Sequence, residues 1–331
     1  EINAASSKVY KQLVGTDVYP VLINTDSTST GVFDFVVSND FVFFSNGVDM
    51  KKYDGTTATN WGITAPSAAV TSTISAGALS PTIGYQWVIS WENSSSEHIS
   101  SPSTASTTTG AQTSKQFNLG GNTTTDTQVD KVRVGRTIDG GSIFFEHPSS
   151  PIAYGTYLTT GFSDNSADSA LTSSVMPLPN QNNRPTASFD PVWFASRIWT
   201  HVDDTLYYSD FEELVRGVEE ESFASTNKRS FGQEITAKRV AGEYLLIFTA
   251  DYIYRIYGDS LATFRMDTLA QGKGTQNRAA VCSFGDFVAW LDSSNTVWIT
   301  DGADMREISF PIRSDISAIA QASAAMTYHT T

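Results

Sequence analysis

Short runs of apolar and aromatic residues alternate with polar turns along this chain, and they recur in a fixed order. Each copy consists of a strand-like run, a tight turn, a second run and a terminal polar turn. The four terminal turns are Asp54-Gly55, Ser209-Asp210, Gly258-Asp259 and Asp301-Gly302. The last three copies follow one another at intervals of about 40–50 residues, and a repeat of that length built from small antiparallel sheets predicts a β-propeller.

The interval between the first and second copies is longer by about 110 residues, roughly the size of a Fibronectin-III or immunoglobulin-like β-sandwich. Pro66 opens this segment and Pro177-Leu178-Pro179 closes it. Strand-like runs recur within it at residues 85–91, 132–134, 143–145 and 157–162. The sequence therefore predicts an all-β chain, a β-propeller with an inserted β-sandwich. Residues 1–65 form the first part of the propeller, 66–180 the Fibronectin-III-like insertion, and 181–331 the continuation, which we expect to be incomplete at its C-terminus.

Turn chemistry and helix signals add detail to this arrangement. Asn46-Gly47 is the pair favoured in a type I′ hairpin turn, in which both central residues have positive φ. Residues 210–217 predict a short helix, because Asp210 can cap it and Glu212 and Glu213 lie in its first turn. A second short helix is predicted between residues 312 and 325.

Composition narrows the possible functions. The chain has 331 residues, of which 40% are hydrophobic and 17% charged, and its formal net charge is −14. Such a chain folds, and its acidic surface argues against tight binding to nucleic acid phosphates. Cys282 is the single cysteine, so an internal disulfide framework and a cysteine-based metal site are excluded. No apolar run is long enough for a membrane span, and no secretory leader is visible.

The patterns that carry enzymatic or metal chemistry are weak. The histidines are far apart in sequence and none has the spacing of a metal-ligand pair. Asp164, Ser166 and Asp168 alternate as in a calcium loop, but the glycine and the terminal glutamate of that loop are missing. Asp203-Asp204 is more typical of a turn than of a catalytic pair. We therefore expect no catalytic residue, no cofactor and no metal, and we expect that the protein is not an enzyme.

Two groups of charged residues are candidates for an interface. The acidic group faces either solvent, a neighbouring subunit or a channel, and it comprises Glu212, Glu213, Glu219, Glu220 and Glu221. The basic group would supply the complementary face of the next subunit, and it comprises Lys228, Arg229, Lys238 and Arg239. Pairing of this kind is head-to-tail, as assembly of a ring requires.

The chain resembles the β-propeller proteins of bacteriophage tails, especially the tail nozzle (tail tubular protein B-like) proteins of short-tailed phages. The likeness is carried by residues 46–66, 85–91, 100–103, 136–140 and 277–308. It implies a structural virion protein that forms a homo-oligomeric ring beneath the portal and adaptor. The ring would extend the channel through which DNA leaves and would contact other tail proteins, while DNA passes without specific binding. The protein would be located in the phage tail of the virion, after synthesis in the host cytoplasm.

Two alternatives remain open at this point. The chain could be a peripheral adhesion, receptor-binding or decoration protein of the virion, which exposure of Trp61 or Trp87 would favour. It could also be a propeller glycosidase, which requires two carboxylates about 5–10 Å apart in the central pocket.

Overall fold

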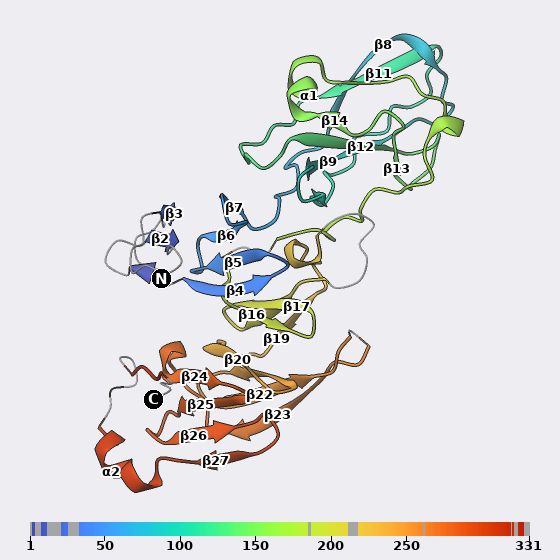
Figure 1. Ribbon diagram of the computed structural model, residues 1–331. Helices are drawn as coiled ribbons and strands as arrows, with labels where there is room; N and C mark the ends of the chain where they lie inside the picture. The colour runs from blue at the N-terminus through green and yellow to red at the C-terminus, as the bar shows by residue number, and fades with distance from the viewer. Residues whose placement is uncertain are drawn as a thin grey trace. The chain divides into compact units, whose positions relative to one another are not determined.

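A computed structural model describes residues 2–3, 8–11, 21–25, 33–184, 187–210, 218–260, 262–318, 320 and 324–327. The chain divides into two compact units by its internal contacts (Figure 1). Unit 1 contains residues 1–58, 186–208 and 228–331, and unit 2 contains residues 59–185 and 209–227. Residues 59–65, 181–185 and 209–227 thus belong to the second unit, although the sequence pattern groups them with the propeller.

Unit 1 is built from antiparallel sheets in which consecutive strands pair in chain order. The first four-stranded sheet contains β4 (Asp34–Ser38), β5 (Phe41–Ser45), β6 (Met50–Tyr53) and β7 (Ala58–Asn60), whose last residues already belong to unit 2. The second contains β16 (Phe189–Phe194), β17 (Arg197–Val202), β18 (Thr205–Tyr208) and β19 (Lys228–Ser230). The third contains β20 (Ala237–Ala241), β21 (Tyr244–Phe248), β22 (Tyr252–Tyr257) and β23 (Arg265–Gln271). The fourth contains β24 (Val281–Phe284), β25 (Phe287–Leu291), β26 (Val297–Thr300) and β27 (Met305–Glu307).

A three-stranded sheet precedes them, with β1 (Ile2–Asn3), β2 (Lys8–Lys11) and β3 (Val21–Thr25). The first strands of the four-stranded sheets lie next to one another, because β16 contacts both β4 and β20, and β20 contacts β24. Apolar side chains fill the space between successive sheets, for example Leu206 and Leu245 between the second and third, and Phe248 and Trp290 between the third and fourth. An all-β fold with several four-stranded antiparallel sheets in this order is consistent with a β-propeller.

The terminal polar turns have a common local geometry. The Asp54 carboxylate accepts hydrogen bonds from the backbone N–H groups of Thr56 (2.8 Å) and Thr57 (2.7 Å). The Asp301 carboxylate accepts the equivalent bonds from Ala303 (2.9 Å) and Asp304 (3.0 Å). Each aspartate follows the third strand of its sheet, so its side chain stabilises the turn that leads into the fourth strand.

The turn at Asn46-Gly47 is not of type I′. Gly47 has a positive φ of 86°, whereas Asn46 is not among the residues with positive φ. The Asn46 side chain instead accepts hydrogen bonds from the backbone N–H groups of Val48 (3.0 Å) and Asp49 (2.7 Å). This bonding widens the connection to a four-residue loop.

Unit 2 consists of two sheets that enclose an apolar core. One sheet contains β9 (Trp87–Asn93), β10 (His98–Ile99), β12 (Lys131–Arg136), β13 (Phe145–Glu146) and β14 (Ile152–Ala153). The other contains β8 (Thr71–Leu79), β11 (Lys115–Gly120) and β15 (Phe162–Asp164). Trp87 and Trp91 from the first sheet and Phe117 from the second are buried in the core.

The strand predicted over residues 157–162 is wrong for most of its length. Residues Tyr154–Thr160 form helix α1, and Gly161 ends it with a positive φ of 70°. Tyr157 is the buried residue of this helix, and its ring packs edge-on against Trp91 with the ring centroids 6.3 Å apart. Two threonines and a tyrosine favour a strand locally, but packing of Tyr157 against the core overrides that preference.

Other helical segments are short. Helix α2 spans Arg313–Ile316, inside the predicted 312–325 segment, and 3-10 turns span Asp168–Ala170, Glu219–Glu221, Arg278–Ala280 and Phe310–Ile312. The predicted helix at 210–217 lies outside the described residues beyond Asp210. No helix in the described part of the chain is long and apolar enough to cross a membrane.

Candidate functional site

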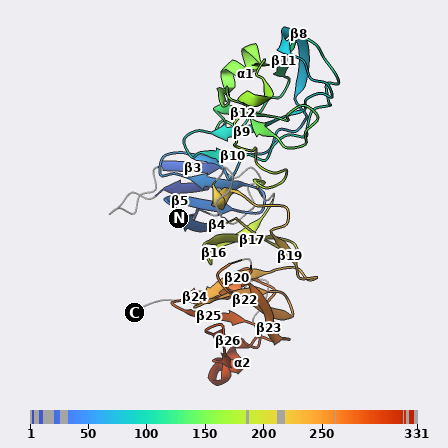
Figure 2. The ribbon, with the colours of Figure 1, turned by 90° about the vertical axis from the view of Figure 1, so that its right-hand side faces the viewer.

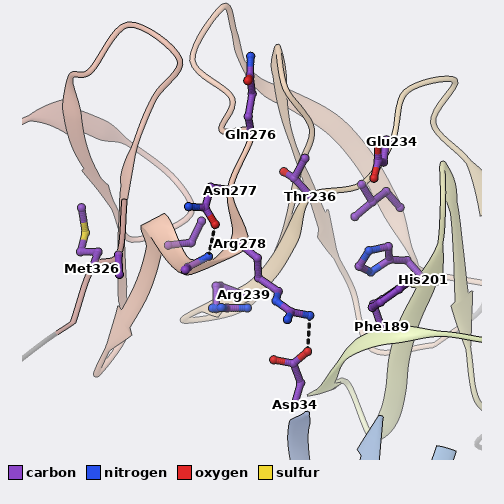
Figure 3. A pocket seen from close by; sticks show the side chains of 14 residues that line it. Asp34, Phe189, His201, Glu234, Thr236, Arg239, Gln276, Asn277, Arg278 and Met326 are labelled. Carbon is purple, nitrogen blue, oxygen red and sulfur yellow. Dashed lines mark hydrogen bonds and ion pairs between the residues drawn. The ribbon is translucent and has the colours of Figure 1, made fainter. Parts of the chain in front are cut away.

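A pocket of about 720 Å³ lies in unit 1, beside the first strands of its four-stranded sheets (Figure 3). Asp34 is the first residue of β4, and Phe189 the first residue of β16. Arg239 lies on β20, and Arg278 lies in the turn just before β24. Each four-stranded sheet thus contributes a charged or aromatic side chain to the pocket, from its first strand or the turn just before it.

Two ion pairs connect neighbouring sheets at this pocket. Arg278 pairs with Asp34, which joins the turn before β24 to the start of β4 (Figure 3). Arg239 pairs with Asp190 at 2.9 Å, which joins β20 to β16. Asp190 also accepts a hydrogen bond of 2.7 Å from the backbone N–H of Lys238. The charges at the inner strands are thus paired within the unit.

Lys238 lies beneath the pocket and is fully buried. Its ammonium group lies 2.5 Å from Nδ1 of His201 and donates to the carbonyl oxygen of Phe189 at 3.3 Å. Burial lowers the pKa of Lys238 to about 8, although Asp190 acts in the opposite direction. Burial and the neighbouring Lys238 lower the pKa of His201 to about 2, so a neutral imidazole accepts the hydrogen bond of the ammonium group.

The two aspartates of the cluster titrate differently. Burial raises the pKa of Asp34 to about 6, and the charge of Asp190 adds to this effect while Arg278 opposes it. Burial would also raise the pKa of Asp190, but Lys238 and Arg239 together hold it below its ordinary value. At neutral pH Asp190 is the permanent anion of the cluster, and Asp34 is the carboxyl group that takes up a proton in mild acid.

Glu234 is the second carboxylate that lines the pocket, together with the polar side chains of Thr236 and Gln276. A carboxyl group with a pKa near 6 can serve acid–base chemistry. The carboxylate that acts on Asp34 is however Asp190, and Glu234 is drawn apart from Asp34 in the pocket (Figure 3). In this structure Asp34 forms an ion pair with Arg278, and this contact holds its carboxyl group in place. No group of three or more His, Cys, Asp or Glu residues within the described ranges is arranged to hold a metal ion.

The structure separates the predicted basic group. Lys228 and Arg229 are exposed on β19, whereas Lys238 is buried and Arg239 is bound to Asp190. Burial therefore removes Lys238 from the surface on which a neighbouring subunit was predicted to dock. Its position on the first strand of a sheet, facing Asp190 and His201, accounts for this burial.

The predicted acidic group is also divided. Glu212 and Glu213 lie outside the described residues, and Glu219 is half-buried. Glu220 and Glu221 are 3% and 1% exposed within unit 2, so they do not form the predicted surface patch. The Glu220 carbonyl accepts a hydrogen bond from the Trp61 indole (2.8 Å), and the Glu221 carboxylate accepts one from the backbone N–H of Gly62 (3.0 Å).

The calcium-loop pattern has a different explanation in the structure. The Asp164 carboxylate is fully buried and pairs with Arg136 at 3.0 Å, and Asp168 pairs with the same guanidinium at 2.8 Å. Trp87, His147 and the backbone N–H of Ser166 also contact the Asp164 carboxylate, at 2.8, 3.1 and 3.2 Å. These carboxylates serve an internal ion pair. Asp203 and Asp204 form a turn, in which Asp204 accepts hydrogen bonds from Thr205 and Ser230.

Sequence reasoning missed Asp34, Asp190 and Arg278. Arg278 lies in the 277–308 stretch that carries the resemblance, but the resemblance gives it no role. Asp34 and Asp190 belong to no motif, and the ion-pair partners of all three residues are distant in the chain. The available signal was positional, since a charged residue lies at or near the start of the first strand of each sheet.

Comparison with known proteins gives little further information. No protein-family model matches the sequence, and no curated protein matches it. Among solved structures the chain is similar to the crystal structure of the N-terminal domain of Nup159, with a TM-score of 0.27 and 12% sequence identity. The alignment covers 75% of this chain and 52% of that chain, so only about half of the other protein's length is spanned. A likeness of this extent supports no inference about function.

Proposed function

We propose that this chain is a structural protein of a bacteriophage tail. It is a β-propeller with an inserted Fibronectin-III or immunoglobulin-like β-sandwich. Copies of it form a ring, or nozzle, that extends the portal and adaptor channel and conducts DNA during ejection. Its location is the virion, and its partners are copies of itself and neighbouring tail proteins.

The observation that carries this proposal is the order of the sheets along the chain. One four-stranded sheet is followed by most of a compact all-β unit, and then by three further four-stranded sheets. The residues that carry the resemblance to tail nozzle proteins lie in the first sheet, in unit 2 and in the fourth sheet. The resemblance therefore extends over both units and is not confined to one local motif.

Charge supports a conducting role better than a binding one. The net charge is −14. The pocket cations Arg239 and Arg278 and the buried Lys238 are engaged by Asp190 or Asp34. A protein that binds DNA tightly needs a face of free cations that displaces counterions. Repulsion between carboxylates and phosphates would let DNA pass through a ring without adhering.

One observation favours a glycosidase as a second candidate. Asp34, with its raised pKa, and Glu234 line the same pocket, and glycoside hydrolysis uses two carboxyl groups. Hydrolysis of nitrophenyl glycosides that is lost in both Asp34→Asn and Glu234→Gln would establish this candidate. The adhesion alternative has less support, because Trp61 and Trp87 are both fully buried within unit 2.

The nozzle function is tested by locating the chain in the virus particle. Virus particles that contain this chain would be imaged after labelling with an antibody against residues 66–180, and negative-stain images of the purified chain would be searched for closed rings. Label on the tail axis beneath the portal is the expected result. Label on fibres or on the capsid surface would replace the nozzle by the adhesion or decoration function.

A further inference from the structure

Another groove of unit 1 lies between strands β18 and β19 of the second sheet and strands β22 and β23 of the third. We call it the β19 groove, and its volume is about 230 Å³, enough for one large side chain. The second and third sheets are drawn one above the other in unit 1 in Figure 2. All of the residues that line the groove belong to unit 1.

Aromatic rings form the floor of the β19 groove. The Trp199 ring lies 4.8 Å from that of Tyr208 and 5.3 Å from that of Phe264, measured between ring centroids. Trp199 is 2% exposed, whereas Tyr208 and Phe264 are half-buried. The groove therefore offers a partly open apolar surface whose rings are held in place by one another.

Three cations surround this floor, Lys228, Arg229 and Arg265, and all three are exposed. In the described part of the chain none of them forms an ion pair with a carboxylate. One guanidinium nitrogen of Arg265, Nη1, donates to the carbonyl oxygens of Ala262 and Phe264, both at 3.1 Å, which fixes the guanidinium at the groove.

Four other arginines of unit 1 do form ion pairs. Arg239, Arg255, Arg278 and Arg313 each pair with a carboxylate of the same unit. In a chain with 35 acidic and 21 basic side chains, carboxylate partners are abundant. Three cations without such partners around one apolar groove therefore indicate complementarity to an external anion.

Strand β19 adds a backbone template to this groove. It is an edge strand of three exposed residues that pairs with β18, and no strand of the described ranges pairs with its other edge. An extended peptide can add to such an edge through main-chain hydrogen bonds, while a pocket accepts one of its side chains.

We propose that the β19 groove binds an acidic peptide segment of a partner protein, which adds as a strand to β19 and inserts one aromatic or large aliphatic side chain against Tyr208 and Phe264. Its carboxylates pair with Lys228, Arg229 and Arg265. This interaction goes beyond the proposed nozzle function and does not require a ring.

The test is fluorescence anisotropy with a labelled peptide of sequence Gly-Asp-Glu-Phe-Glu-Asp-Gly and the whole chain. We expect saturable binding that weakens with salt and falls about tenfold or more in the double variant Arg229→Glu, Arg265→Glu. Arg306→Glu, an exposed arginine on β27, is the matched control and should leave the affinity unchanged. Thermal melting would establish that both variants fold.

Two modified peptides test the geometry. Replacement of Phe by Ser in the peptide should reduce the affinity if the side chain enters the groove. Methylation of alternate backbone nitrogens should abolish binding if the peptide adds as a strand. Equal affinity for the double variant and the native chain would overturn the proposal, as would absence of binding or preferential binding of a single-stranded oligonucleotide.

Discussion

Both units of this protein contain a cluster of buried charges, and the two clusters differ in how they are completed. In unit 2, Asp164 and Arg136 are both fully buried, and Trp87, His147 and Asp168 contact them from neighbouring strands and turns. In unit 1, Asp190 and Lys238 are also buried, but Asp34, Arg239 and Arg278 extend the cluster to the wall of a pocket.

This difference is reflected in the titration of the carboxyl groups. Burial would raise the pKa of Asp164, but the hydrogen bond from His147 and the charge of Arg136 lower it below its ordinary value. In unit 1 burial and Asp190 prevail over Arg278 and raise the pKa of Asp34 to about 6. The unit 2 cluster, which we call the closed cluster, joins two sheets through buried charges. The unit 1 cluster reaches a pocket and contains a carboxyl group, Asp34, that changes charge near neutral pH.

The largest expected loss of stability comes from removing the buried cation of the closed cluster. Arg136→Met removes the cation that neutralises Asp164 and leaves a buried carboxylate without its charge partner. We expect the free energy of unfolding of unit 2 to fall by about 3–5 kcal/mol. Urea denaturation measures this loss, and Lys131→Met, a half-buried lysine on the same strand, is the control. A loss below about 1 kcal/mol would mean that Asp164 is neutralised by other means.

A somewhat smaller effect is expected in unit 1. Asp190→Asn keeps the shape of the side chain but removes the anion between Lys238 and Arg239, and we expect a loss of about 3 kcal/mol. The additional substitution Lys238→Met should restore part of the stability, because it removes the uncompensated buried charge. Asp286→Asn, at an exposed turn, serves as the control. Strictly additive losses in the double variant would contradict the coupling between Asp190 and Lys238.

Protonation of Asp34 should make the stability of unit 1 depend on pH. Its folded-state pKa of about 6 exceeds the ordinary 3.8, so the folded chain binds this proton more tightly than the unfolded chain. The stability linked to this proton is fully present below about pH 4 and is lost as the pH rises through about 6. We expect a loss on the order of 2 kcal/mol from this group, since the carboxyl group is partly exposed.

Denaturation of the native chain and of Asp34→Asn across this pH range measures that loss. The difference in unfolding free energy between native chain and variant should decrease with rising pH between about 4 and 6. A constant difference for Asp34→Asn would show that Arg278 holds this pKa at its ordinary value.

The parts of the fold that could be predicted from the sequence are those determined by neighbouring residues. Alternation of apolar and polar residues predicts strands, and Asp54 and Asp301 stabilise the turns that follow them through bonds to the next few residues. The buried ion pairs could not be predicted in this way. Asp34 and Arg278 are 244 positions apart, so their pairing depends on how the sheets pack. The same dependence explains α1, where burial of Tyr157 outweighed a local preference for strand.

The smallest expected effect tests how firmly the wall of the unit 1 pocket is held. Gly47 and Gly55 both have positive φ, of 86° and 94°, which a residue with a Cβ adopts at a cost of about 1 kcal/mol. A Cβ on Gly55 would meet no atom within 4 Å, whereas a Cβ on Gly47 would lie 2.0 Å from the Phe189 ring. Gly55→Ala should therefore lower the free energy of unfolding by the backbone cost alone. Gly47→Ala should lower it by about 1 kcal/mol more, because the Phe189 ring must move. Chemical denaturation compares the two variants. Equal losses would mean that Phe189 swings aside freely, and the pocket of unit 1 would then differ from the closed cluster of unit 2 in rigidity as well as in charge.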